Sequence, residues 1–211
     1  MRHFCVSDIF KVADEINSHD LVRNGIVSVN PAFLELTKKK AVDSLAMHGL
    51  ELTGGAYDIR VSRSLSVQPE SGAHSAVWAY KTGARIEIAA ENRCWLRMDL
   101  AKELAHLYVG MDQNEYHDFD LLLTASRTAR DNLPVHDNDA IRDDEMFCFY
   151  LAIEVLLPWG PLRDEAMDMH KSGKTDFEIA TRFRIPVRII THFFDGGWSE
   201  RSWNGHRGPI C

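Results

Sequence analysis

The sequence contains few cysteines and no long hydrophobic run, and both absences narrow the class of protein. Four of the 211 residues are cysteine, and they lie far apart without a Cys-x-x-Cys pair. This spacing is typical of a reducing compartment and argues against a disulfide framework. No stretch is apolar enough for a membrane span, and the first residues lack the apolar core of a secretory signal. We therefore expect a soluble, cytoplasmic protein without disulfides.

An excess of positive charge is also missing. The chain has 31 acidic and 24 basic residues, which give a formal net charge of −7. A negative surface repels the phosphate backbone, so nucleic-acid binding by the whole surface is disfavoured, although a local basic patch stays compatible with it. Glycine-rich phosphate-binding patterns and the Gly-x-Ser-x-Gly pattern do not occur. Nucleotide-binding and serine-hydrolase functions therefore have no support.

The N-terminal part of the chain, residues 1–50, has the periodicity of helices. The length fits a single domain that spans residues 1–211. Apolar residues at helical spacing predict a first helix behind a cap at Ser7 or Asp8. A second helix is predicted to begin with Asn30 as its cap and Pro31 in its first position, and to end near residue 47.

Residues 51–90 follow a different pattern, in which apolar and polar residues alternate. The alternation covers 57–61, 76–80 and 84–88, and the last two segments flank the turn Lys81-Thr82-Gly83. It predicts two or three antiparallel strands. The expected fold class is α+β, mainly helical, with a small antiparallel β-sheet.

The remainder of the chain is predicted to be helical around one long loop. Residues 91–158 hold a helix over 97–110, a polar loop from Asp112 to Asp139, and a helix from Ala140 to Leu157 that is apolar almost all round. A helix of that composition is buried. Residues 159–211 hold helices near 161–170, 176–183 and 186–194, followed by a tail from 196 without a clear period.

One of these helices carries a motif with chemical meaning. Lys102 and His106 are one turn apart and share a face, with Glu103 beside them. The layout is that of zinc helices with the pattern His-Glu-x-x-His, in which two histidines bind the metal and the glutamate is the general base for the bound water. Here the pattern reads Lys-Glu-x-x-His. A Glu-x-x-His pattern often occurs by chance in a helix, so the surrounding sequence is needed to judge whether it indicates a peptidase fold.

The wider sequence resembles the ImmA/IrrE family of metallo-endopeptidases. The motif helix follows a strand and an arginine-containing link, a later helix ends Val155-Leu156-Leu157-Pro158, and the segment Ile179-Ala180-Thr181-Arg182-Phe183 comes after it. Order and spacing are similar to those of the family over about residues 84–194. The resemblance implies a zincin-like fold in which the motif helix lies next to a small sheet.

The same resemblance also implies a loss of metal ligands. Glu103 falls on the family's general base and His106 on its second zinc histidine, whereas Lys102 stands in place of the first. The third ligand, a glutamate in the family, falls on Phe147, and Asp144 is the carboxylate one turn away on a similar face. A catalytic zinc site needs three protein ligands and an open position, so two of the three are missing.

Two functions from different classes follow from this comparison. The first is a degenerate, inactive peptidase fold that needs no cofactor and regulates a protein partner by binding it. Family members inactivate helix-turn-helix repressors, often in phage, mobile elements or stress responses, so the resemblance implies a partner of that kind. The alternative is an active zinc endopeptidase with an atypical ligand set of His106 and Asp144 and with Glu103 as base. In the first reading the Lys102 ammonium replaces the metal cation.

A third function rests on the basic residues near the C-terminus. Residues 176–194 also resemble a helix-turn-helix, and Arg182, Arg184 and Arg188 make the segment locally basic, which would suit a partner or DNA contact. The acidic chain and the missing turn glycine disfavour DNA binding. Histidines and aspartates in the long loop could form another metal site, but scattered side chains of this kind are more often solvated: His117, Asp118, Asp120, His136, Asp137 and Asp139.

Overall fold

The computed structural model describes residues 6–19, 29–47, 57–63, 75–80, 83–90, 92–110, 140–158 and 160–194. The long loop and the tail lie outside these ranges, so the predictions made for them stay predictions. The elements in chain order are α1 (Val6–Ser18), α3 (Val29–Met47), β1 (Asp58–Ser62), β2 (Ser75–Tyr80), β3 (Gly83–Ile88), α4 (Arg93–Gly110), α6 (Ala140–Leu156), α7 (Pro161–Lys171), α8 (Asp176–Phe183) and α9 (Val187–His192).

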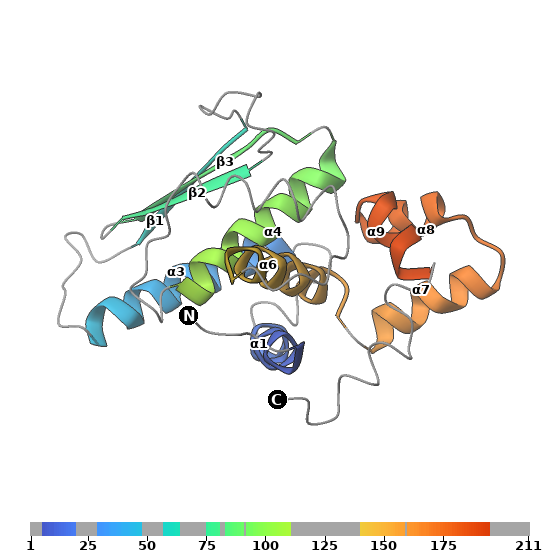
Figure 1. Ribbon diagram of the computed structural model, residues 1–211, viewed down its shortest axis with the longest axis horizontal. Coiled ribbons are helices and arrows are strands. Elements are labelled where there is room, and N and C mark those ends of the chain that lie inside the picture. The colour runs from blue at the N-terminus through green and yellow to red at the C-terminus, as the bar shows by residue number, and fades with distance from the viewer. Residues whose placement is uncertain are drawn as a thin grey trace.

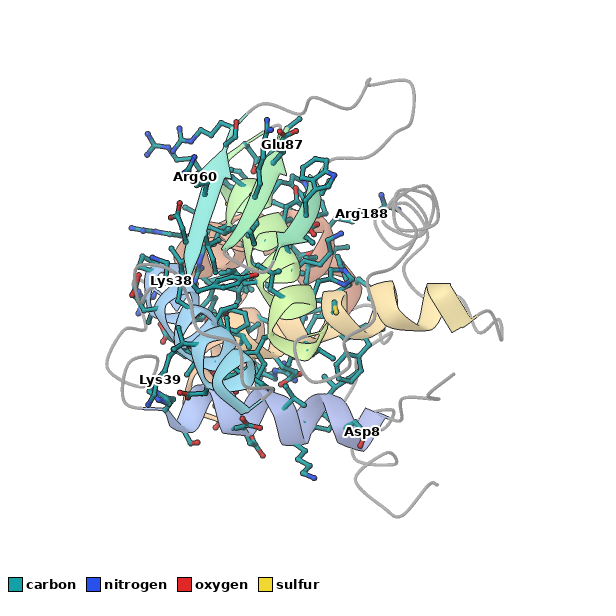
Figure 2. All side chains as sticks on the ribbon, turned by 90° about the vertical axis from the view of Figure 1, so that its left-hand side faces the viewer. Asp8, Lys38, Lys39, Arg60, Glu87 and Arg188 are labelled. Carbon is teal, nitrogen blue, oxygen red and sulfur yellow. The ribbon has the colours of Figure 1, made fainter. Side chains whose placement is uncertain are left out.

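The elements are stacked in layers (Figure 1). The sheet lies on α4, α6 packs on α4, and α1 packs on α6, while α3 lies beside α4 and reaches β1. Helices α7, α8 and α9 form a separate group at the end of α6, away from the sheet (Figure 1). The sheet and α1 thus occupy opposite sides of the helical layers (Figure 2). The predicted α+β class, mainly helical with a small sheet, is confirmed.

The sheet is mixed, and the prediction of an antiparallel sheet was wrong in this respect. Its strand order is β1-β3-β2, with β2 antiparallel and β1 parallel to β3. The hairpin between β2 and β3 was visible in the sequence because a short turn joins the two strands. Strand β1 precedes β2 in the chain but pairs with β3, and alternation within a strand carries no information about direction. Its orientation was therefore not predictable from the pattern.

Strand β3 begins at Gly83, where the backbone of β1 leaves no room for a side chain. A Cβ atom at this position would lie 2.3 Å from the carbonyl oxygen of Asp58, the residue opposite Gly83 in the register. Any other side chain would push the two strands apart. On β3, Ile86 and Ile88 are fully buried, and α4 packs against this strand and β2. Tight strand pairing and an apolar face together hold the sheet on α4.

Three predicted helix starts lie two to four residues too late, and α4 begins at Arg93 rather than at residue 97. Helix α1 includes Val6, so neither Ser7 nor Asp8 is its cap, and α3 already begins at Val29 rather than after an Asn30 cap. Pro31 is tolerated inside the first turn because the first N–H groups of a helix have no partner within the helix. The residues from Phe147 to the end of α6 at Leu156 are buried except for the half-buried Tyr150, as the composition of the helix predicted. No helix among the described residues is both long and apolar enough to cross a membrane.

Helix α7 is held to α6 by a buried ion pair that the sequence pattern did not reveal. The Arg163 guanidinium donates from Nη2 to Glu154 Oε1 at 2.6 Å and to the carbonyl oxygen of Leu157 at 2.9 Å. Both charged side chains are about as buried as core residues, at 3% and 2% exposure. The guanidinium also lies 5.4 Å from the centroid of the Phe193 ring. Arg163 thus joins α6, α7 and the end of α9.

Helix α8 begins with a capping box. The Thr175 hydroxyl accepts from the Glu178 backbone N–H, and the Glu178 carboxylate accepts from the Thr175 backbone N–H at 2.9 Å and from Lys174 Nζ at 2.9 Å. The helix ends at Arg184, which adopts the left-handed conformation with φ 55°. A three-residue turn, 184–186, then leads into α9. The predicted pair of short helices is confirmed, without the glycine that usually occupies such a turn.

The capping box predicts a pH dependence at Glu178. Its hydrogen bonds to Thr175 and Lys174 lower the pKa of Glu178 from 4.5 to about 2. A lowered pKa stabilises the folded state above pH 4.5, and this contribution is lost as the pH falls through 2. We expect an NMR titration of the Glu178 carboxyl group to show a midpoint near 2, and a Thr175→Ala variant to move it upward. A wild-type midpoint near 4.5 would contradict the capping box.

Candidate functional site

The motif helix α4 begins at a well-formed cap. The Asn92 side-chain oxygen accepts hydrogen bonds from the backbone N–H groups of Cys94 at 2.9 Å and Trp95 at 3.0 Å, which satisfies two donors of the first turn. From there the helix runs between the sheet, α3 and α6. Leu104 and Leu107 are buried. A helix enclosed on several sides normally carries apolar residues all round.

A strip of ionisable residues interrupts this apolar surface. Asp99, Lys102 and Glu103 are buried, with 6%, 4% and 2% of their surface exposed, and His106 is half-buried. Their spacing of three or four residues places them on one side of the helix. Charged side chains are rarely buried in this way unless they interact with one another or serve a site. The strip therefore marks the candidate functional site.

The centre of the strip is a buried ion pair joined by a hydroxyl group. Lys102 Nζ lies 2.9 Å from Glu103 Oε1, and Ser75 Oγ donates to the same oxygen at 2.5 Å. Ser75 is the first residue of β2 and is 3% exposed, so the contact joins the sheet to α4. We refer to these three residues, Ser75, Lys102 and Glu103, as the Lys102 cluster. Ser75 was not among the predicted site residues, because it belongs to no local motif and only the packing of β2 on α4 brings it there.

The residues at the expected ligand positions do not fit zinc. Lys102 presents an ammonium group without a lone pair, and this group is in contact with the glutamate that would serve as base. Phe147, at the third position, is 3% exposed and has no donor atom. Asp144 belongs to α6, but its side chain lies outside the described residues. Within the described ranges no group of three or more His, Cys, Asp or Glu side chains could hold a metal ion.

A second polar contact connects α4 with the C-terminal helices. Arg97 Nη1 donates to the carbonyl oxygen of Phe183 at 2.5 Å and to that of Arg184 at 3.4 Å. Burial lowers the pKa of the Arg97 guanidinium, and the charge of Arg184 lowers it further. The two carbonyl groups end α8, where backbone acceptors are left without helical partners. Arg97 thereby fixes the end of α8 against the first part of α4.

The three predicted arginines lie in different surroundings. Arg182 pairs with Glu165 of α7, with Nε 2.8 Å from Oε1, and so faces α7. Arg184 is exposed in the turn after α8, and Arg188 is exposed on α9. The histidines and aspartates of the long loop lie outside the described residues, so the alternative metal site there stays a hypothesis.

Comparisons with protein-family models, with curated proteins and with solved structures give no match for this chain.

Proposed function

We propose that this chain is a regulatory protein of the ImmA/IrrE type whose catalytic metal has been replaced by the Lys102 ammonium group, and that it acts by binding a protein partner. The observation that carries the proposal is the buried contact between Lys102 and Glu103, 2.9 Å long. In the family these two positions supply a metal ligand and the general base. Here each neutralises the other, and no step of metal-dependent hydrolysis follows from them.

The replacement has a simple electrostatic reason. A carboxylate in a buried position needs a positive charge or several hydrogen bonds, because transfer from water to the interior costs several kcal/mol. Glu103 is 2% exposed and has both a cation and a hydroxyl donor on the same oxygen. The Lys102 ammonium group balances the negative charge of Glu103 without a bound metal ion. The motif helix can therefore stay packed in the interior although two of the three metal ligands are missing.

The edge of the sheet supports a binding function. Among the described residues β2 pairs with β3 alone, and we propose that its other edge is the binding surface. An extended segment of a partner can add to such an edge by main-chain hydrogen bonds. Ser75 ties the start of β2 to α4, which holds this edge in a defined position. We propose that the partner is a transcriptional regulator such as a helix-turn-helix repressor, as the resemblance implies.

Metal content tests the proposal directly. We expect the wild-type protein, purified without chelator, to contain less than one zinc ion per chain when measured by inductively coupled plasma mass spectrometry. The double variant Lys102→His/Phe147→Glu supplies the missing imidazole and carboxylate beside His106. If the alignment with the family is correct, this variant should bind about one zinc ion per chain. A chelator should then lower its melting temperature and leave that of the wild type unchanged.

Matched variants separate the possible outcomes. Lys102→His alone offers two ligands and should bind zinc much more weakly than the double variant. One equivalent of zinc in the wild type, lost in His106→Ala, would overturn the proposal and favour an active peptidase with an atypical ligand set. A folded double variant that takes up no zinc would show that Phe147 does not stand at the family's third ligand position.

A further inference from the structure

Two of the three large hydrophobic side chains that are exposed in the described ranges lie on α8 and α9. Phe177 is 68% exposed and Val187 is 40% exposed, and the third, Val61, lies on β1. Burying an aromatic side chain of this kind removes apolar surface from water and so favours a complex. An exposed phenylalanine on a short and well-capped helix is therefore a candidate contact residue.

The two helices that carry these side chains are connected at both ends. Helices α8 and α9 are joined by the turn 184–186 at one end, and at the other the Thr191 hydroxyl donates to Asp176 Oδ2 at 2.7 Å. Phe177 is the neighbour of Asp176 in α8, and Val187 lies one helical turn before Thr191 in α9. Phe177 and Val187 are thus the exposed apolar side chains of two helices that are held together at both ends. We call the exposed sides of these two helices the α8–α9 surface.

The charges around this surface have one predominant sign. Residues 174–194 contain four Lys and Arg residues and two acidic ones, in a chain whose net charge is −7. Arg184 is the C-cap residue of α8, where the turn leads to Val187, and Arg188 follows Val187 in α9. Both arginines are exposed. Among the acidic groups, Asp176 accepts from Thr191 and Glu178 accepts from Lys174 within this segment.

Arg182 does not contribute to this surface. Its guanidinium is engaged with Glu165 of α7, on another side of α8. The set of three arginines suggested by the sequence is therefore reduced to Arg184 and Arg188. Figure 2 shows Arg188 on the opposite side of the molecule from Lys39 of α3, which is also exposed.

We infer that the α8–α9 surface binds an acidic amphipathic segment of a protein partner. Exposed aromatic and arginine side chains are enriched where proteins contact each other. Carboxylates of such a segment would pair with Arg184 and Arg188, while its apolar face covers Phe177 and Val187. DNA fits less well, since an apolar Phe177 offers nothing to a phosphate backbone and α9 has only six residues in Val187–His192.

This inference is independent of the proposed function, because none of its residues belongs to the Lys102 cluster. The probe is a synthetic helical peptide of about 18 residues, with Leu and Phe on one face and Glu on the other. We expect the full chain to bind it in a fluorescence-anisotropy titration. Arg184→Glu, Arg188→Glu and Phe177→Ser should each weaken binding about tenfold. Lys39→Glu, the same charge reversal on α3, should leave the affinity unchanged.

Each of the following results would overturn the inference. The first is equal affinity for a peptide in which every Glu is replaced by Lys. The second is wild-type affinity in all three surface variants, or no binding to the acidic peptide at all. The third is salt-dependent binding of a random DNA duplex that competes with the peptide and disappears in Arg184→Glu, which would identify the surface as a nucleic-acid site. Circular dichroism of each variant confirms that it is folded.

Discussion

Replacement of Lys102 by methionine is expected to lower the free energy of unfolding by about 3–5 kcal/mol. Methionine has a similar length but no charge, so the Glu103 carboxylate would remain buried next to Ser75 without its cation. An intact buried ion pair contributes little to stability. Removal of one partner destabilises the protein strongly, because the other charge stays buried without compensation. Urea unfolding of wild type and Lys102→Met, followed by circular dichroism, measures the difference.

The chain offers a matched control for this experiment. Lys174 and Glu178 are the same two residue types at the same 2.9 Å distance, but their side chains are 51% and 45% exposed. Lys174→Met should change the stability by less than about 1 kcal/mol, because water solvates the remaining carboxylate. A Lys102→Met/Glu103→Gln variant should recover most of the loss, since the amide still accepts from Ser75. If Lys102→Met lowered the free energy of unfolding as little as Lys174→Met, Lys102 would not be the cation that compensates the buried Glu103 carboxylate.

Replacement of Arg163 by methionine is expected to have an effect of similar size, roughly 3–5 kcal/mol. The change would leave the buried Glu154 carboxylate without the Arg163 guanidinium and remove a donor from the Leu157 carbonyl oxygen. Because Arg163 joins α7 to α6, we expect the amides of α7 to α9 to exchange with deuterium much faster than in the wild type. Hydrogen-exchange mass spectrometry measures this change by segment.

Two further variants give this prediction its control. Arg182→Met removes an arginine from a pair of similar length, 2.8 Å, between side chains that are 60% and 38% exposed. Its effect should stay below about 1 kcal/mol. Arg163→Lys should remain destabilised, because one ammonium group does not reproduce the planar guanidinium that also packs over the Phe193 ring. Unchanged exchange of α7 to α9 in Arg163→Met would contradict the role assigned to the pair.

Most elements of the fold could be predicted because their signals are local. The periods of apolar residues placed α6, the strands and the C-terminal helices within a few residues of their observed positions. The helix starts at Val6 and Val29 were misplaced, since a good capping residue can also be accommodated inside a first turn. The direction of β1 was missed because parallel pairing depends on how the chain crosses the sheet.

The candidate site, too, could be predicted only in part. The sequence by itself determined that Lys102, Glu103 and His106 share one side of a helix, because residues three or four positions apart lie on the same side of any α-helix. Only the tertiary structure decided that Lys102 points inward to Glu103, that Ser75 of β2 completes the contact, and that Arg163 meets Glu154. A charged side chain is buried or solvated according to what packs around it, and that depends on residues distant in the chain.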